Sequence, residues 1–342
     1  MSFADRGRAT GIGAIFNPSA RARFIIRRLV QGVPTIFFIV IACFFLLRLA
    51  PGDAADVLAG ESGAATAQYI EALRTKFQLD RPVAVQLLAY VKNVFLFDLG
   101  YSFRQDMPVS ALILSRLFPT VLLMATALGL AIFGGMALGI FAARRPNGWF
   151  DQFISVLSLL FYSTPMFWAG LMLIVVFSLH LGWFPTSGME TVAEFNQGWA
   201  RVNDIGWHVV LPSITLSLFY LALFMRLMRA SMLEQLGMDY VITARAKGVS
   251  ERKILTRHVA RNALLPILTM IGVQMGNLIG GSVIVETVFG WPGLGLLAFD
   301  ALFARDLNLL MGIFLVSAIM VVVVNILVDI AYTFVDPRIK LQ

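Results

Sequence analysis

The chain has 342 residues, of which 58% are hydrophobic and only 14% are charged. This composition excludes an ordinary soluble domain and indicates a polytopic membrane protein. The formal net charge of +7 by itself is compatible with nucleic-acid binding, so the positions of the charges along the chain must be considered. The single cysteine, Cys43, lies in an apolar run and can form no internal disulfide.

Six windows are long enough to cross a bilayer and contain no Asp, Glu, Lys or Arg. A membrane-spanning helix needs about 20 mostly apolar residues. The windows cover residues 29–47, 117–143, 152–189, 205–225, 262–285 and 307–328. Arginines precede the first window, but its apolar core is longer than that of a secretory signal, so we interpret it as an uncleaved span. The sequence therefore predicts an all-α, polytopic membrane protein with six transmembrane helices.

The charges between the windows predict the orientation. Six spans place both ends on one side, where the connecting segments hold 18 basic and 7 acidic residues, whereas the opposite segments hold 9 basic and 13 acidic residues. Cytosolic loops carry an excess of Lys and Arg. We therefore predict an N-in/C-in topology, in which the basic charge is topological and does not indicate nucleic-acid binding. The predicted parts are a cytosolic segment at 1–28, a transmembrane domain at 29–335 with an outer segment at 48–116, and a cytosolic tail at 336–342.

Small residues and a proline shape the second and third windows. Gly135 and Gly139 have the GxxxG spacing that lets two helices approach closely. Pro165 lies in the third window, where it removes a backbone hydrogen bond and kinks the helix. A kink that faces a pore and a plain packing kink both fit this pattern. His208, near the predicted outer boundary, is interpreted as a surface or capped residue because no second His or Cys accompanies it.

A long basic loop covers residues 239–266. Residues 241–247 have helical propensity, and Gly248 is placed to end that helix in a left-handed conformation. Ser250 is placed to cap a second helix, with Glu251 in its first turn. Such a loop either only anchors the topology or, because it has a defined helix–Gly–helix shape, docks another protein at the cytosolic face.

The fifth window carries Gly272, Gly276 and Gly280 at four-residue spacing, together with Gln274 and Asn277. The glycines make a smooth helix face, and the amides can hydrogen-bond across an interface. This face either packs within the chain or contacts a partner around a pore, with the two amides lining it.

Glu286 ends the apolar run of the fifth window. An unpaired carboxylate is costly there, so a partner or access to water is expected. The turn that follows is rich in Gly and Pro and predicts a re-entrant or interfacial loop at the outer mouth.

Other chemistries lack the residues that they need in this sequence. No GxxxxGK[ST] phosphate loop occurs, so the chain is not expected to hydrolyse ATP by itself. No ladder of intramembrane carboxylates, as proton-coupled carriers use, is present. The three histidines are dispersed, and no metal-ligand or nucleophile–base grouping stands out. We therefore expect neither an enzyme nor a metal site.

Four stretches of the chain carry a family's motifs. LRLAPGD follows the first window, TARAKG and RNALLP lie in the basic loop, VETVF and PGLG follow the fifth window, and DPR lies near the end. Over residues 24–342 the chain resembles the B-type permeases of the dipeptide, oligopeptide and nickel ABC importers. Ala244 and Gly248 are the only strict matches to the general EAA motif of ABC permeases. The form of the motif in this subfamily, with TARAKG and RNALLP, is matched closely.

The resemblance implies the type I ABC importer permease fold and a location in the bacterial inner membrane. The chain would form half of a translocation path, with a second homologous permease, two cytosolic ABC ATPases, an extracytoplasmic solute-binding protein and membrane lipid as partners. It would bind no cofactor itself, because ATP is bound by the ATPases. The implied substrates are di- or oligopeptides, or related solutes such as glutathione, nickel chelates or sugar oligomers. The alternative is an ion- or proton-coupled carrier that acts alone.

The resemblance also suggests roles for residues within a coupling loop at 229–265, where the helix at 239–247 would sit in a groove of an ATPase. The residues expected to couple are Asp239, Tyr240, Thr243, Ala244, Arg245, Ala246, Lys247, Gly248 and Arg252. The residues expected in the translocation path or its outer gate are Pro165, Gln274, Asn277, Glu286 and Phe289. Gly272, Gly276 and Gly280 are expected in subunit packing.

Overall fold

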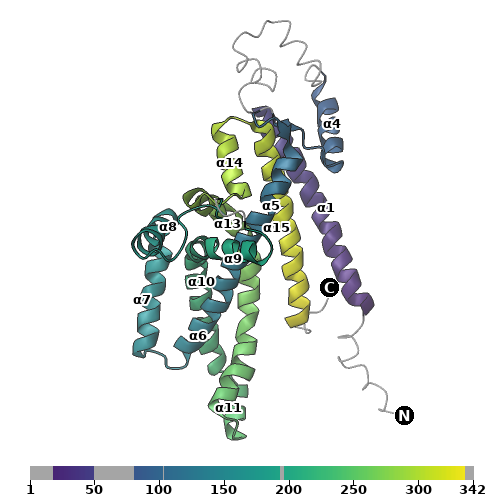
Figure 1. Cartoon of the computed structure of the whole chain (residues 1–342). Coiled ribbons are helices and arrows are strands. Elements are labelled where there is room, and N and C mark those ends of the chain that lie inside the picture. The colour runs from purple at the N-terminus through teal and green to yellow at the C-terminus, as the bar shows by residue number, and fades with distance from the viewer. Residues whose placement is uncertain (1–17, 50–80, 103, 193–195, 336–342) are drawn as a thin grey trace, which may run out of the picture.

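The computed structural model describes residues 18–49, 81–102, 104–192 and 196–335, and these are almost entirely helical (Figure 1). The all-α prediction is confirmed. Most of the predicted segment 1–28, residues 50–80 of the predicted outer segment and the predicted tail 336–342 lie outside the described residues.

The elements follow one another along the chain, with η marking π-helical turns. They are α1 (Pro18–Leu49), α4 (Val83–Phe95), β1 (Tyr101–Ser102), β2 (Met107–Pro108), α5 (Val109–Gly129), η1 (Leu130–Gly134), α6 (Gly135–Ala143), α7 (Trp149–Ser163), α8 (Met166–Leu173), η2 (Ile174–His180), α9 (Trp199–His208), α10 (Val210–Leu236), α11 (Asp239–Ala246), α12 (Glu251–Lys253), η3 (Ile254–Val259), α13 (Ala260–Phe289), α14 (Leu294–Phe303) and α15 (Leu307–Val335). The two strands form a short antiparallel hairpin in which Tyr101 pairs with Pro108.

Helices α1 and α15 lie side by side at one edge of the molecule (Figure 1). A Cβ added to Gly32 of α1 would lie 3.2 Å from Cγ1 of Val322 of α15, so the two helices are in close contact there. Helix α1 begins at Pro18, earlier than the predicted window at 29–47, because helical structure continues into the arginine-rich segment.

Helix α10 lies at the centre of the larger hydrophobic core. Helix α6 packs against it at two glycines. A Cβ on Gly135 would lie 2.9 Å from the backbone oxygen of Leu221, and one on Gly139 would lie 2.7 Å from that of Met225. Both distances are shorter than side chains allow, so only glycine permits this approach. The predicted close helix contact at the GxxxG pair is confirmed, and its partner belongs to the same chain.

The third predicted window is not one straight span. Helix α7 and the α8–η2 helix meet at an angle of 107° around Thr164 and Pro165. Thr164 is extended, with φ −81° and ψ 126°. A proline disfavours the helical conformation of the residue before it. The predicted distortion at Pro165 is confirmed, and it is larger than a kink because the proline breaks the helix.

Among the described residues, three helices are by themselves long and apolar enough to cross a membrane. They cover Val109–Ala143, Val210–Leu236 and Leu307–Val328. Counting each bent helix pair as one span raises the number to five, and the second bent pair is formed by the end of α13 with α14, at 82°. The multi-pass membrane fold is confirmed, whereas the count of six and the N-in/C-in orientation remain predictions.

The basic loop folds as helix, glycine and helix. Helix α11 lies at the lower end of the molecule in Figure 1, and α13 rises from η3 towards α14 in the upper half. We call residues 238–259 the elbow.

Candidate functional site

The elbow turns at Gly248, which has φ +75°, a left-handed conformation that favours glycine. The Val249 N–H donates to the carbonyl of Ala244 at 3.1 Å, and the Gly248 N–H donates to that of Arg245 at 2.9 Å. These two bonds form a Schellman motif, which satisfies the last carbonyls of a helix. The predicted left-handed helix stop at Gly248 is confirmed.

Helix α12 begins directly after Ser250, as predicted. The Ser250 carbonyl accepts hydrogen bonds from the N–H groups of Lys253 at 2.9 Å and Ile254 at 3.0 Å, but its hydroxyl makes no capping bond. The position of the cap is therefore right and its side-chain bond is wrong. An ion pair between Arg245 Nε and Glu251 Oε1, 2.6 Å apart, spans the turn. The hydrogen bond from Arg245 lowers the pKa of Glu251 below its ordinary value.

The underside of the elbow is buried against α10. The side chains of Val241, Ile254 and Val259 are fully buried and belong to the larger hydrophobic core. The Tyr240 hydroxyl donates a hydrogen bond of 2.9 Å to Oε1 of Gln235. These contacts fix the orientation of α11 relative to the end of α10.

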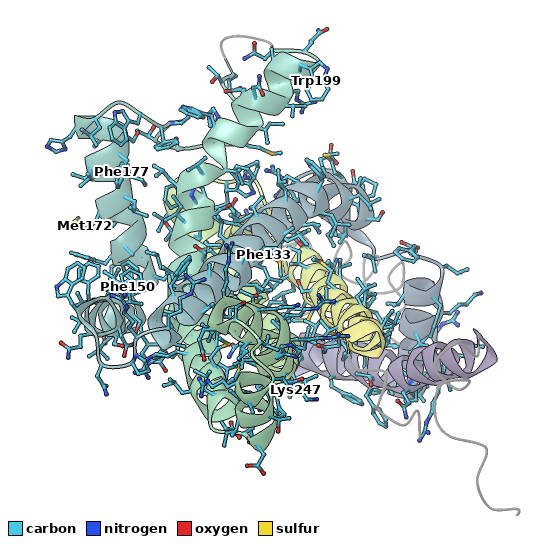
Figure 2. All side chains as sticks on the ribbon, turned by 90° about the horizontal axis from the view of Figure 1, so that it is seen from below. Phe133, Phe150, Met172, Phe177, Trp199 and Lys247 are labelled. Atoms are coloured by element: carbon cyan, nitrogen blue, oxygen red, sulfur yellow. The ribbon has the colours of Figure 1, made fainter. Side chains whose placement is uncertain are left out.

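Another face of α11 is exposed. Met238 is 40% exposed and Ile242 is 60% exposed, and with Ala246 they form an apolar stripe at four-residue spacing. The predicted coupling residues that are exposed are Asp239, Thr243, Arg245, Ala246, Lys247, Gly248 and Arg252, while Tyr240 and Ala244 are half-buried. Lys247 lies at the tip of the elbow (Figure 2). Met238 and Ile242 are additional to the predicted residues, although their spacing is visible in the sequence.

An ion pair that the motifs do not reveal joins α7 to α10. The carboxylate of Asp151, which is 2% exposed, accepts hydrogen bonds from Arg229 Nε at 2.5 Å and from Arg229 Nη2 at 2.7 Å. It also accepts one from the Asn147 N–H at 2.9 Å. Asp151, near the start of α7, therefore pairs with an arginine of the same chain.

The second candidate site lies around Glu286, which is fully buried. Its carboxylate accepts hydrogen bonds from the Thr120 hydroxyl at 2.9 Å and from the N–H groups of Gly295 at 2.6 Å and Leu296 at 3.0 Å. The Thr120 oxygen in turn accepts a bond from the Leu294 N–H at 2.7 Å. The side chain of the buried Ser282, one turn earlier on α13, also hydrogen-bonds to Glu286. The expectation that Glu286 needs a partner is confirmed, and the partners are protein groups of α5, α13 and α14.

Three glycines shape the turn between α13 and α14. Gly290 has φ +58° and ends α13, with the Trp291 N–H donating to the Glu286 carbonyl at 2.8 Å. A Cβ on Gly293 would overlap the Glu286 carboxylate, and one on Gly295 would lie 2.9 Å from its Oε2. The indole of Trp291, which is fully buried, donates to the carbonyl of Pro119 of α5. This geometry explains why the turn is rich in glycine. The helices on either side meet at 82°, and the predicted re-entrant or interfacial loop at the outer mouth remains a prediction.

The remaining residues predicted for the translocation path lie on α13 and at the start of α8. Pro165 marks the break between α7 and α8. Phe289 is buried, and its carbonyl accepts a hydrogen bond of 2.9 Å from the Gly188 N–H. Gln274 is half-buried on α13, and the side chain of Asn277 lies outside the described part. Their roles in a path remain predictions.

The glycines of α13 have different neighbours. A Cβ on Gly272 would lie 3.3 Å from Val328 Cγ1, and one on Gly276 would lie 3.9 Å from Val321 Cγ1, both on α15. Gly280 has no such neighbour within 4 Å. Two of the three therefore face α15 of the same chain, and Gly280 faces open space.

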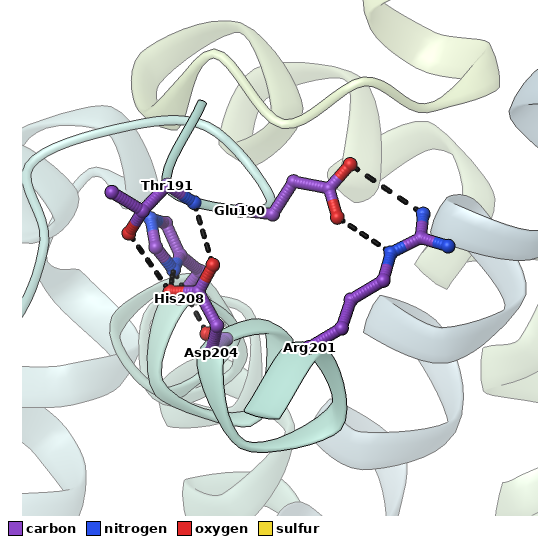
Figure 3. A network of polar contacts seen from close by, with 5 residues as sticks. All are labelled: Glu190, Thr191, Arg201, Asp204 and His208. Atoms are coloured by element: carbon purple, nitrogen blue, oxygen red, sulfur yellow. Dashed lines mark hydrogen bonds and ion pairs between the residues drawn. The ribbon is translucent and has the colours of Figure 1, made fainter. Parts of the chain in front are cut away.

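A polar network holds the loop before α9 (Figure 3). The carboxylate of Asp204 accepts bonds from the Thr191 N–H at 2.6 Å and hydroxyl at 2.9 Å, and Arg201 pairs with Glu190 at 2.7 Å. Burial would raise the pKa of Asp204, but the bonds from Thr191 outweigh it, so the pKa is lowered. His208 lies beside Asp204 and is buried, so the interpretation as a surface residue is wrong and that as a capped residue fits.

Within the described ranges no group of three or more His, Cys, Asp or Glu residues is placed to hold a metal ion.

These observations define a multi-pass helical membrane subunit with an exposed basic elbow. A family model described as "Binding-protein-dependent transport system inner membrane component" matches residues 135–341, and the model of its N-terminal part matches residues 21–125. The chain belongs to this family. It is therefore a permease subunit of an ABC importer in the inner membrane, and family members work with a binding protein and an ATPase.

Curated relatives cover nearly the whole chain. A putative peptide permease protein of Brucella suis is 44% identical over 320 residues, which cover 93% of this chain and 99% of the relative. The oligopeptide transport system permease protein AppB of Bacillus subtilis is 41% identical over 93% of this chain and 99% of its own length. The glutathione transport system permease protein GsiC of Escherichia coli is 38% identical over 93% of this chain and 98% of its own length.

Proposed function

We propose that this chain forms half of the translocation path of an importer for short peptides, and that its elbow transmits the closure of a cytosolic ATPase to that path. The observation that carries the proposal is the contrast between the two faces of α11. Its underside is fixed by buried Val241, while Met238 and Ile242 present an exposed apolar stripe. A helix with spaced apolar anchors is suited to a groove on another protein.

The proposed assembly contains a second homologous permease, two ATPases that bind the ATP, and an extracytoplasmic binding protein that delivers the substrate. The cationic rim of the elbow, with Arg245, Lys247 and Arg252 exposed, supports a protein partner with acidic groups around such a groove. The absence of a phosphate loop from the sequence supports ATP hydrolysis on the partners rather than on this chain.

Short peptides are the proposed substrate class. The relatives are named for peptides, oligopeptides and glutathione, and glutathione is itself a tripeptide. The test is uptake by the reconstituted importer, with labelled dipeptides, pentapeptides and glutathione competing against one another. Uptake of a nickel chelate or a sugar oligomer in preference to all of these peptides would contradict the assignment.

The coupling role is tested by substitution of Gly248. No atom lies within 4 Å of a Cβ added there, so a side chain is disfavoured only through the backbone angle of +75°. A β-branched residue adopts such an angle very rarely, whereas asparagine tolerates it. We expect G248V to insert in the membrane and to lose ATP-driven uptake, and G248N to retain most of it.

The matched control is G237A, because Gly237 has φ −82°, which alanine adopts freely. We expect its uptake to equal that of the unmodified importer. Normal uptake by G248V would show that the elbow does not couple ATP hydrolysis to transport.

A carrier that acts alone is not favoured. The purified chain in lipid vesicles, with a proton or sodium gradient and no ATPase, should accumulate no peptide. Accumulation under these conditions would support the carrier.

A further inference from the structure

One helix, α13, connects the elbow to the turn that contains Glu286. It follows η3 directly and has 30 residues, which corresponds to about 45 Å. Figure 1 shows α11 near one end of α13 and α14 beyond the other. The two most distinctive polar features of the chain therefore lie at opposite ends of a single element.

Glu286 and Thr120 together bind the first three N–H groups of α14. Thr120 accepts from the first of these groups, and the Glu286 carboxylate accepts from the next two. A helix offers its first N–H groups no partner of its own, and its N-terminus favours an anion. Helix α14 is therefore held by side chains of α5 and α13, and not by a cap from its own sequence.

Helices α13 and α14 are in close contact. A Cβ on Gly295 would lie 2.6 Å from the Cα of Val283, so the backbones of the two helices touch at this point. The connection between them is only the short turn 290–293, which the buried Trp291 fastens to α5. The first turn of α14 is therefore held against α13 by a close backbone contact and a short connection.

We infer that Glu286 is a positioning residue through which a displacement of α13 moves α14. The inference rests on the proposed coupling role of the elbow, because that role supplies the displacement. Hydrogen bonds to a carboxylate are stronger than those between neutral groups, especially away from water. The elbow, α13 and α14 then move as one unit, in which the Glu286 carboxylate joins α13 to α14.

The first variant to test is E286Q, which keeps the size of the side chain. Its amide oxygen can still accept from the Gly295 and Leu296 N–H groups, and its NH2 can donate to the Thr120 hydroxyl, so E286Q removes the negative charge that strengthens these hydrogen bonds. T120V removes the hydroxyl that bridges Glu286 and α14, and T120S restores it. We expect E286Q and T120V to behave alike and T120S to behave as the unmodified chain.

The readout is a distance between the elbow and α14. Spin labels are placed at Lys253, an exposed elbow residue outside the proposed coupling set, and at Phe303, which is 73% exposed, after C43A removes the only cysteine. The complete importer is measured in lipid nanodiscs without nucleotide and with trapped ATP. The unmodified chain should give one narrow distance in both states, and E286Q should give a broad distribution. Transport per ATP hydrolysed should fall about tenfold in E286Q, as for the loss of one hydrogen bond to a charged group.

Asp306 offers a matched control. It is also a buried carboxylate at a helix start, where it accepts bonds from the Leu309 N–H at 3.1 Å and from the Ser102 hydroxyl, but it does not touch α13. We expect D306N to leave both the distance distribution and the transport per ATP unchanged. If D306N and E286Q behave alike, or if E286Q keeps the narrow distance, Glu286 is only a structural cap and the inference is overturned. The nucleotide-free distance tests this contact even where G248V shows that the elbow does not couple.

Discussion

Val241 and Ile242 are neighbours on α11, one buried and the other exposed, and this makes them a sharp test of the elbow. Val241 is fully buried, whereas Ile242 is 60% exposed. V241A removes two methyl-sized groups from a packed site. Lost burial together with the cavity left behind costs about 2 kcal/mol. I242A removes a similar amount of apolar surface from a site that is already in contact with solvent.

The two substitutions should therefore separate stability from partner binding. A cost of about 2 kcal/mol corresponds to a factor of about 30 in the opening equilibrium of the elbow. Amide hydrogen exchange of residues 239–247 in the purified chain should speed up by that factor in V241A and stay unchanged in I242A. In a pull-down with the ATPase, I242A should weaken binding although its elbow is intact. The reasoning is refuted if V241A leaves exchange unchanged, or if I242A accelerates exchange as much as V241A does.

Two further predictions concern other parts of the chain. G139L should lower the yield and thermal stability of the detergent-solubilised protein, because a Cβ there would already lie 2.7 Å from the Met225 carbonyl oxygen, and overpacking costs about 1–3 kcal/mol or more. G129A, at a glycine with no neighbour within 4 Å, should leave both unchanged. Equal losses in the two variants would contradict the close contact at Gly139. The lowered pKa of Asp204 adds stability above the pKa of the unfolded chain, which is about 3.9. Protection of the amides around Thr191 against hydrogen exchange should therefore be constant from pH 7 to about 5, and it should fall only on further acidification through the lower folded pKa. D204N should lack this acid-dependent fall. A fall that persists in D204N would show that another group is responsible.

Local signals in the sequence predicted the elbow well. The stop at Gly248 and the helix start after Ser250 depend on the backbone preferences of single residues, so a one-dimensional pattern contains them. The close approach at Gly135 and Gly139 was visible for the same reason, since spacing alone places both on one helix face. The side-chain cap at Ser250 was wrong: its hydroxyl makes no capping bond, and only its carbonyl accepts from the N–H groups of the following turn.

Tertiary contacts were beyond the reach of these patterns. That Glu286 needed a partner followed from its burial in an apolar run, but Thr120, which is 166 positions away, could not be identified without the fold. The break at Pro165 is indicated in the sequence by the length of the third window. The third window covers residues 152–189, far more than the roughly 20 that one span requires. Asp151 and Arg229 were unremarkable in sequence because only packing brings them together.

The way in which the elbow is seated has a consequence for chimeric permeases. Exposed and buried residues alternate along its sequence. Replacing only the exposed positions with those of another permease would therefore leave the buried contacts of Val241, Ile254 and Val259 in place. Replacing the entire loop would instead introduce buried side chains that fit the α10 helix of the other permease. Swapping ATPase preference between importers is thus best attempted through the outward positions alone.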